Sequence, residues 1–330
     1  MLVNERDPQT LLAPLEKARG ILVGLSGGPD SVAALALLSQ WHDHPPIFAA
    51  TFDHGFRAES RAEAQQCASL CAQLDIPHMI LNWEGDKPAT RIQEEARVAR
   101  YAALIAHAKQ IGADHLVTAH HADDQMETIL FRLMRGSSIG GLAGMHAQLS
   151  RDGINHARPF LGWRKSELIA VCEARGLNYI RDPSNDDPRF ARTQMRRLTG
   201  PLEEAGLGPE TFTRLATRAA RAEAALTEGT RQLRSEALLR QTDETIELDA
   251  KRLKNAPAEL VLRLLMAEIG RIGQMPRLEQ AEALAADFSA AWTANTPWRA
   301  TLGGTLIDLR SDSVLVISRE APRKAAPSAT

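Results

Sequence analysis

The segment with the clearest chemical potential follows the apolar run Ile21–Leu25 and consists of Ser26, Gly27, Gly28, Pro29, Asp30 and Ser31. Glycines let a backbone approach a ligand closely and adopt positive φ angles. Amides at the start of the helix that follows, together with the two serine hydroxyls, would then form an anion site. A carboxylate belongs in such a site only if a cation bridges it to phosphate, so Asp30 implies Mg²⁺. A plain strand-to-helix turn capped by Ser and Asp is the simpler interpretation.

Polar residues also follow the next apolar run, in Phe52-Asp-His-Gly-Phe-Arg57. If the run is a strand, we expect Asp53 and His54 to point into the same crevice as the first segment. An Asx turn that ends the strand is the structural alternative for Asp53.

Three carboxylates stand in one helical turn after the apolar run His115–Ala119. They belong to the segment His120–Thr128, and they are Asp123, Asp124 and Glu127. The helix dipole favours acid at a helix start, but it explains one carboxylate rather than three. Like charges this close need a cation among them, which indicates either an Mg²⁺ site or a pocket for the ε-amine of lysine. Zinc is a weak alternative, because no tetrahedral set and no cysteine lies nearby.

The elements that must position these residues alternate along the first half of the chain. Apolar runs predict strands, and helical periodicity predicts a helix after each strand. The predicted strands are 21–25, 47–52, 77–81 and 115–119, and the predicted helices are 30–41, 58–74, 92–110 and 123–135. This order predicts the α/β class, with a doubly wound parallel sheet that binds ligands at the carboxyl ends of its strands.

A different pattern begins near residue 210. A long helical stretch precedes short strands at 245–248, 305–309 and 313–317, with helices at 258–269 and 278–288 between them. We therefore expect a catalytic domain at 1–210 and a smaller, mainly helical domain at 211–330, with a disordered tail at 321–330. Residues 189–240 hold ten arginines against six glutamates. Arg214, Arg218 and Arg221 share a face, which either grips nucleic-acid phosphates or merely meets solvent.

Composition excludes several classes of protein. The chain has 330 residues, 44% of them hydrophobic and 24% charged, so global disorder is excluded. The mean hydropathy is −0.24, and no apolar run approaches the length of a membrane span. Three cysteines cannot form a disulfide framework, and no secretory signal opens the chain. We expect a cytoplasmic protein without a membrane partner.

The segment from Ser26 to Ser31 resembles the PP-loop of the N-type ATP pyrophosphatases, which cleave ATP to AMP and diphosphate. With the segments Asp53–Arg57, His120–Thr128 and Arg135–Met145, the chain closely resembles the tRNA(Ile)-lysidine synthetase family, in its short form. The resemblance is dense over residues 20–205 and loose beyond them, where the family carries a tRNA-binding domain. It implies ATP and Mg²⁺ as cofactors, with free L-lysine and tRNA(Ile) bearing a CAU anticodon as substrates. A homodimer is one option for the assembly.

The resemblance also implies roles for individual residues. ATP would be bound by Ser26, Gly27, Gly28, Pro29, Asp30, Ser31, Asp53 and His54. Catalysis or lysine binding would fall to Asp123, Asp124, Glu127, Arg192 and Arg57, and Mg²⁺ to Asp30 and Asp124. Contacts to tRNA would come from Arg135, Arg196, Arg214, Arg218 and Arg221. Cytidine 34 would be adenylated on its C2 oxygen and then attacked by the lysine amine.

Three other functions compete with this one. A tRNA thiolase on the same loop would need a reactive cysteine or cysteine pairs, whereas Cys67, Cys71 and Cys172 lie in helical patterns. A small-molecule synthetase of the NAD or GMP type shares the ATP chemistry but leaves the basic tract unexplained. A non-enzymatic RNA-binding protein would explain the arginines but neither the Ser26–Ser31 segment nor the clustered carboxylates.

Overall fold

A computed structural model describes residues 8–56, 59–83, 92–180, 191–294 and 296–320. The side chains of some helix-end residues, Arg192 and Arg196 among them, lie outside this description. The chain divides into two compact units, Met1–Arg218 and Ala219–Thr330. The boundary falls inside helix α9 (Pro209–Ala237). The assignment of tRNA binding to the second unit stays a prediction, and the expected disordered tail at 321–330 lies outside the described residues.

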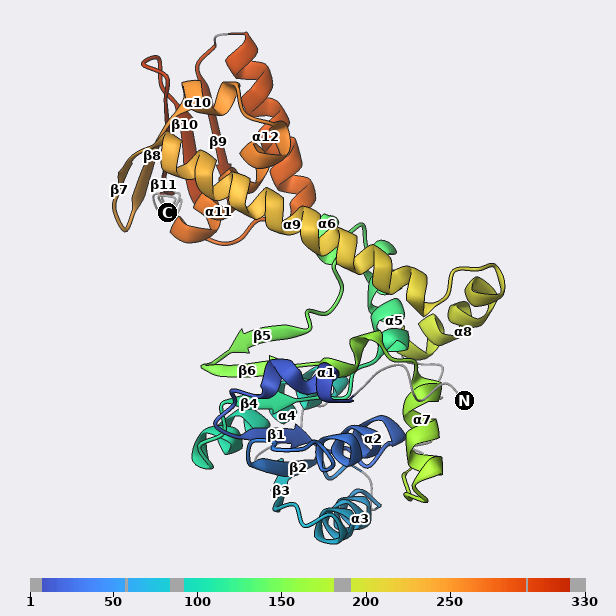
Figure 1. Cartoon of the computed structure of the whole chain (residues 1–330). Helices are drawn as coiled ribbons and strands as arrows, with labels where there is room; N and C mark the ends of the chain where they lie inside the picture. The colour runs from blue at the N-terminus through green and yellow to red at the C-terminus, as the bar shows by residue number, and fades with distance from the viewer. Residues whose placement is uncertain (1–7, 57–58, 84–91, 181–190, 295, 321–330) are drawn as a thin grey trace, which may run out of the picture. The chain divides into compact units, whose positions relative to one another are not determined.

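A six-stranded sheet organises the first unit, in the order β3-β2-β1-β4-β6-β5 (Figure 1). Its strands are β1 (Ile21–Gly24), β2 (Ile47–Asp53), β3 (His78–Asn82), β4 (His115–Val117), β5 (Gln148–Arg151) and β6 (Ile154–Ala157). All neighbours pair in parallel except β5 with β6. The predicted α/β class with a mainly parallel sheet is confirmed.

Helices cover both faces of this sheet. The helices that pack in the core clusters of the sheet are α2 (Pro29–Leu38), α3 (Ser60–Gln73), α4 (Ile92–Gln110) and α7 (Lys165–Ala174). The other helices of this unit are α1 (Pro8–Leu12), α5 (Ala122–Leu133), α6 (Ile139–Leu142) and α8 (Ala191–Glu204), of which α6 and α8 pack on α5. Successive strand residues point to opposite faces. Leu22 of β1 therefore packs in a core cluster with α4, whereas its neighbours Ile21 and Val23 pack with α2, α3 and α7. Because β1, β2 and β4 run parallel, the turns after these strands lie together at the carboxyl end of the sheet.

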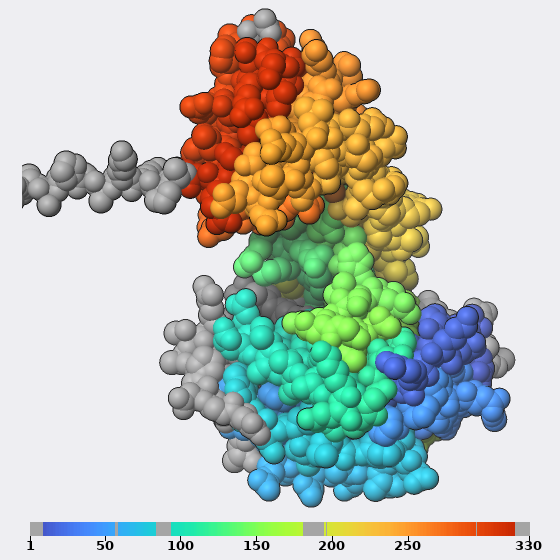
Figure 2. All heavy atoms as spheres, turned by 90° about the vertical axis from the view of Figure 1, so that its left-hand side faces the viewer, coloured from blue at the N-terminus to red at the C-terminus, as the bar shows by residue number. Residues whose placement is uncertain are grey.

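Sequence analysis missed the β5–β6 hairpin. Its two-residue turn is Asp152-Gly153, with φ angles of 50° and 79°. Asp-Gly is the pair that a type I′ hairpin turn favours, so the signal was present in the sequence. All four residues of β5 are exposed, and the green segment that holds the hairpin lies at the surface (Figure 2). An exposed edge strand carries little apolar periodicity, which explains the omission.

The second unit is an antiparallel sheet packed with helices. The strands, in the order β7-β8-β11-β10-β9, are β7 (Leu238–Gln241), β8 (Thr245–Asp249), β9 (Trp298–Leu302), β10 (Thr305–Leu309) and β11 (Val314–Arg319). The remaining helices are α10 (Ala250–Lys254), α11 (Ala258–Ile272) and α12 (Leu278–Thr293). The predicted strands β8, β10 and β11 are confirmed, while β7 and β9, the two edges of the sheet, were missed. None of the described helices is long and apolar enough to cross a membrane.

Candidate active site

The turn between β1 and α2 is held together by its two serines. The Ser31 hydroxyl accepts a hydrogen bond from the Ser26 amide at 3.1 Å and donates one to the Gly28 carbonyl at 3.0 Å. The Ser26 hydroxyl lies 3.1 Å from that of Ser31. Gly28 is the N-cap of the ten-residue helix α2. The first amides of a helix have no partner within it, so this turn presents donors suited to a bound anion.

The two glycines of the turn have different surroundings. Gly27 has a φ of +80°, and a Cβ there would collide with the Ile180 side chain and lie 3.1 Å from Cys67 Sγ. Gly27 also accepts a hydrogen bond from the Ile180 amide at 2.8 Å. Among the described residues, a Cβ on Gly28 would meet only Ser26 Oγ, at 3.7 Å. Gly27 is therefore needed for packing, whereas Gly28 leaves open space beside the helix N-terminus.

Asp30 carries an acceptor that the described residues do not use. Its Oδ1 is buried and has no hydrogen-bond partner among them. Its Oδ2 lies 3.6 Å from His121 Nε2. A buried carboxylate oxygen without a partner is costly unless a ligand or cation supplies one. Asp30 Oδ1 is thus available to a group beyond the described residues.

His121 lies among three carboxylates. Its Nε2 is 3.6 Å from Asp30 and 3.4 Å from Asp124, and its Nδ1 is 3.4 Å from Asp123. Burial by itself lowers the pKa of His121, but hydrogen bonds to Asp123 and Asp30 and the charge of Asp124 outweigh it and raise the pKa to about 10. At the same time, His121 Nδ1 accepts a hydrogen bond from the Asp124 amide at 3.3 Å, as the cap of α5. Sequence analysis gave His121 no role, although it lies among the carboxylates for which a cation was expected.

Asp123 is engaged in holding two helices together. Its Oδ2 accepts a hydrogen bond from the Lys165 amide at the start of α7, at 2.8 Å, and its Oδ1 lies 3.5 Å from Arg164. Arg164 also pairs with Glu203 at 2.7 Å and with Glu210 at 3.1 Å. Burial raises the pKa of Asp123, but the hydrogen bonds from His121 and the Lys165 amide and the charge of Arg164 hold it at about 2. The lysine-binding role predicted for the three carboxylates therefore suits Asp124 and the buried Glu127 better than Asp123.

The residues after β2 form a compact turn. Asp53 Oδ1 accepts hydrogen bonds from the Gly55 amide at 2.8 Å and from the Ser60 hydroxyl at 2.7 Å. His54 Nδ1 accepts from the Phe56 amide at 3.1 Å. The geometry matches the Asx turn that the sequence left open for Asp53. The predicted ATP contacts of Asp53 and His54 stay predictions, although β2 pairs directly with β1 at this edge.

The Gly-rich segment after α5 is attached to that helix by two polar side chains. Gln125 accepts a hydrogen bond from the Met145 amide at 2.7 Å and donates one to its carbonyl at 3.0 Å. Arg132 Nη1 donates to the carbonyls of Gly141 and Gly144, at 2.8 and 2.9 Å. The sequence offered Gln125 as part of the His120–Thr128 segment but no sign of its partner.

The predicted arginines fall into separate groups. Arg57 lies outside the described residues, and so do the side chains of Arg192 and Arg196, although both positions belong to α8. Arg135 is exposed and stacks over the Phe131 ring at 4.2 Å. We call Arg214, Arg218 and Arg221 of α9 the arginine face. All three are exposed and have no carboxylate partner within the described part of the chain, whereas Arg231 further along α9 pairs with Glu228 at 2.6 Å.

The three cysteines are poorly suited to sulfur chemistry. Each is a buried free thiol. Burial raises the pKa of Cys71 to about 12 and that of Cys172 to about 11, and it also raises the pKa of Cys67. Thiolates are the nucleophiles and metal ligands, so raised pKa values oppose both roles. These surroundings disfavour the thiolase alternative.

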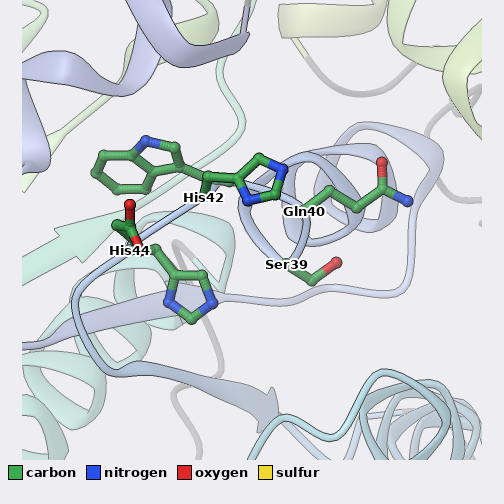
Figure 3. Close-up of a pocket in the computed structure, with 6 residues that line it drawn as sticks. Ser39, Gln40, His42 and His44 are labelled. Atoms are coloured by element: carbon green, nitrogen blue, oxygen red, sulfur yellow. The ribbon is translucent and has the colours of Figure 1, made fainter.

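A surface hollow elsewhere in the first unit does not resemble a site. It lies where the chain passes from α2 to β2, at the amino end of that strand, and is lined by Ser39, Gln40, Trp41, His42, Asp43 and His44 (Figure 3). The labelled side chains spread apart rather than converge on one point. His44 Nδ1 lies 2.7 Å from the Pro45 carbonyl oxygen. Parallel sheets bind ligands at the opposite edge, where the Ser26–Ser31 turn lies.

The Ser26–Ser31 turn lies at the carboxyl end of β1 in a mainly parallel sheet, an arrangement typical of nucleotide-binding proteins. Residues 2–203 match the family model of the PP-loop domain, which defines the class of this protein. Among solved structures, a U34-tRNA thiolase from Methanococcus maripaludis is similar with a TM-score of 0.55 and 19% identity, over 64% of this chain and 77% of that one. That likeness concerns the fold alone.

Relatives identify the branch within this class. The tRNA(Ile)-lysidine synthase of Rhodopseudomonas palustris is 41% identical over 96% of this chain and 95% of its own length. That of Methylobacterium sp. (strain 4-46) is also 41% identical, over 93% of this chain and 91% of its own length. The chain belongs to the tRNA(Ile)-lysidine synthase family of PP-loop proteins.

Proposed function

We propose that this protein joins free L-lysine to C2 of cytidine 34 in the CAU anticodon of tRNA(Ile). The observation that carries the proposal is the Ser26–Ser31 turn. Its helix N-terminus, the open space at Gly28 and the Asp30 oxygen that has no partner among the described residues suit a triphosphate bound with a cation. The family relation along nearly the whole chain selects this substrate pair among PP-loop reactions. The modified tRNA changes from methionine to isoleucine specificity.

The reaction has two steps. The C2 carbonyl oxygen of cytidine 34 attacks the α-phosphorus of ATP, and the bond to the β-phosphate oxygen breaks to release diphosphate. The neutral ε-amine of lysine then attacks C2, the C–O bond to AMP breaks, and the amine loses its protons. Amides at the start of α2 and the Ser26 hydroxyl bind the phosphates and stabilise charge that develops on them, while the Ser31 hydroxyl holds the turn through the Gly28 carbonyl. Closely positioned reactants supply much of the remaining rate enhancement.

Asp30 is the residue best suited to hold Mg²⁺. Within the described residues, no group of three or more His, Cys, Asp or Glu side chains is placed to hold a metal by itself. Mg²⁺ in nucleotide sites commonly uses one or two carboxylates, with phosphate oxygens and water as its other ligands. The buried Oδ1 of Asp30 fits that pattern. When bound, the ion neutralises charge on the phosphates.

Asp124 and Glu127 are the proposed partners of the lysine ε-amine. They stand three residues apart on α5, and Asp124 Oδ2 accepts a hydrogen bond from the His121 amide at 3.2 Å. A carboxylate near the amine can bind its ammonium form and later accept its proton. Asp123 stays with Arg164 and the start of α7, where it fixes the position of α5.

The tRNA is proposed to contact the arginine face, Arg135 and Arg196, whereas Arg192 and Arg57 are proposed to serve catalysis or lysine binding. An unpaired guanidinium binds phosphate in two-point geometry and stacks on bases. A single-stranded anticodon loop suits this recognition, because its bases can be turned out and stacked. A cytoplasmic location is part of the proposal, because tRNA, ATP and free lysine are substrates found together there.

The test is diphosphate and AMP release with ATP, lysine and a tRNA(Ile) transcript bearing C34. Omission of lysine, or replacement of the tRNA by a methionine tRNA, should abolish the lysidine product. Asp30→Asn should lower turnover by about 100-fold or more. Asp43→Asn is the matched control, because Asp43 lies at the far edge of the sheet and should leave turnover unchanged. Release of ADP instead of AMP would overturn the proposal, and normal turnover of Asp30→Asn would remove the role of Asp30.

A further inference from the structure

One arginine of the first unit binds acidic residues on both sides of the turn between α8 and α9. Arg164 Nη2 lies 2.7 Å from Glu203, near the end of α8, and Arg164 Nη1 lies 3.1 Å from Glu210, in the first turn of α9. Arg164 Nη2 also lies 3.5 Å from Asp123 of α5. Three carboxylates therefore share one guanidinium, whose side chain is only 27% exposed.

The position of Arg164 is set by the backbone on either side of it. The Trp163 carbonyl accepts a hydrogen bond from the Ala122 amide at 2.7 Å, and the Lys165 amide donates one to Asp123 at 2.8 Å. Both contacts join this part of the chain to the start of α5. The guanidinium of Arg164 is therefore attached to a fixed part of the first unit, and the carboxylates of α8 and α9 come to it.

The start of α9 is held in place by hydrophobic packing. Phe212 and Ala216 of α9 are buried in one core cluster with Met126 and Ile129 of α5. Removal of these apolar side chains from water stabilises the contact between the two helices. The first turns of α9 therefore stay beside α5, with Glu210 within reach of the guanidinium.

A second partner for Glu210 stands on its own helix. Arg214 is four residues further along α9, and an acid four residues before a base is the favourable arrangement for an ion pair on a helix. Glu210 is also the only acidic residue within four positions of either Arg214 or Arg218. Glu210 and Arg214 are both described, yet they form no ion pair, and the Arg214 guanidinium donates to the Thr211 hydroxyl at 3.1 Å. The Glu210 carboxylate pairs instead with Arg164, which is less exposed, so water screens that pair less.

We infer that Arg164 is a positioning residue for tRNA binding, because it holds the Glu210 carboxylate away from Arg214 and leaves the arginine face with its full positive charge. Without Arg164, Glu210 would pair with Arg214 and occupy a guanidinium that is proposed to bind an RNA phosphate. Affinity for RNA depends on the number of such cation–phosphate contacts, so one of them would be weakened. The effect on tRNA rests on the proposed function, whereas the choice of partner by Glu210 does not.

The first experiment measures the affinity of the full-length protein for a tRNA(Ile) transcript by filter binding at several salt concentrations. Arg164→Gln should weaken binding by about two- to fivefold, the size expected of one exposed charge pair. The slope of log K against log salt concentration should become shallower by at most about 0.7–0.9, the value for one phosphate contact. Addition of Glu210→Gln should restore both quantities, because no carboxylate then competes for Arg214. Asp43→Asn removes the same charge at the far edge of the sheet and should restore neither.

A second set of variants tests whether Arg214 is the residue affected. In an Arg214→Gln background, Arg164→Gln should not make the salt slope any shallower, since the competing pair can no longer form. If Arg164→Gln does not fold, as judged by circular dichroism, Arg164→Lys takes its place, because an ammonium group lacks the fork that binds carboxylates on several sides. Arg164→Lys should show a smaller loss with the same restoration by Glu210→Gln. Failure of Glu210→Gln to restore binding, or an equal loss in the Arg214→Gln background, would overturn the inference.

The second experiment needs no RNA. A crystal structure of the Arg164→Gln protein should show the Glu210 carboxylate paired with the Arg214 guanidinium, and a structure in which the two stay apart would overturn the inference. Failure of the wild-type protein to bind tRNA(Ile) would refute the proposed function instead, and the crystal structure would still decide the partner of Glu210.

Discussion

Alanine substitutions at Gly27 and Gly28, the two glycines of the Ser26–Ser31 turn, should have different effects: one on stability and the other on ATP binding. Gly27→Ala places a side chain at a φ of +80°, against the Ile180 side chain and 3.1 Å from Cys67 Sγ. The left-handed conformation costs about 1–2 kcal/mol and the overpacking about 1–3 kcal/mol. The free energy of unfolding should therefore fall by about 2–5 kcal/mol. In a unit of this size each kcal/mol lowers the Tm by about 2–4 °C.

Gly28→Ala should behave in the opposite way. Gly28 has a φ of −69°, which any residue adopts, and within the described part of the chain its added Cβ would meet only Ser26 Oγ, at 3.7 Å. Replacement of glycine by alanine at an N-cap should cost less than about 1 kcal/mol. The methyl group would occupy the space proposed for the phosphates, so we expect ATP affinity to fall at least about tenfold, or about 1.4 kcal/mol.

Thermal unfolding followed by circular dichroism and calorimetric titration with ATP measure the two effects on the same samples. The expected pattern is a lower Tm for Gly27→Ala and a near-normal Tm with weak ATP binding for Gly28→Ala. Wild-type ATP affinity in Gly28→Ala would refute the claim that this space receives the nucleotide. A wild-type Tm in Gly27→Ala would refute the packing argument.

Replacement of all three arginines of the arginine face by glutamine should weaken tRNA binding. The slope of log K against log salt concentration should become shallower by about 0.7–0.9 for each lost phosphate contact, as measured by filter binding at several salt concentrations. Arg231→Gln is the matched control and should change neither quantity, because the Arg231 guanidinium is paired with Glu228. In the second unit, Glu268 is fully buried and accepts from Arg234 at 2.7 Å, so Glu268→Ala should cost about 3–5 kcal/mol in urea unfolding, and an unchanged midpoint would contradict a structural role. The pKa of His156 is about 3 in the folded protein, against an ordinary 6.5, so the unfolded chain binds a proton first as the pH falls. The contribution of neutral His156 to the free energy of unfolding is therefore complete above pH 6.5 and declines toward pH 3. Between pH 6.5 and pH 5 the wild type should lose about 2 kcal/mol that His156→Gln does not lose, and equal losses in urea unfolding would show that His156 is not protected.

Local patterns predicted the elements that position the site. Three elements of the site follow one another in the sequence: β1, the Ser26–Ser31 turn and α2. Each is marked by its own local signal, which is an apolar run for the strand, glycines for the turn and helical periodicity for the helix. The strands that were missed, such as β5 and β9, lie at sheet edges, where burial is one-sided or slight. Edge strands depend on a partner strand for their hydrogen bonds more than on their own hydrophobic pattern.

The sequence by itself determined the α/β class, the glycine-containing turn Ser26–Ser31 and the group of carboxylates on α5, because each depends on residues close together along the chain. Only the tertiary structure decided how those groups are paired. Asp123 meets the Lys165 amide across 42 positions, and Thr118 meets His156 across 38. Such contacts arise when distant strands and helices pack side by side, and no local pattern encodes them. The partner of each charged or hydrogen-bonding group is therefore a property of the folded protein.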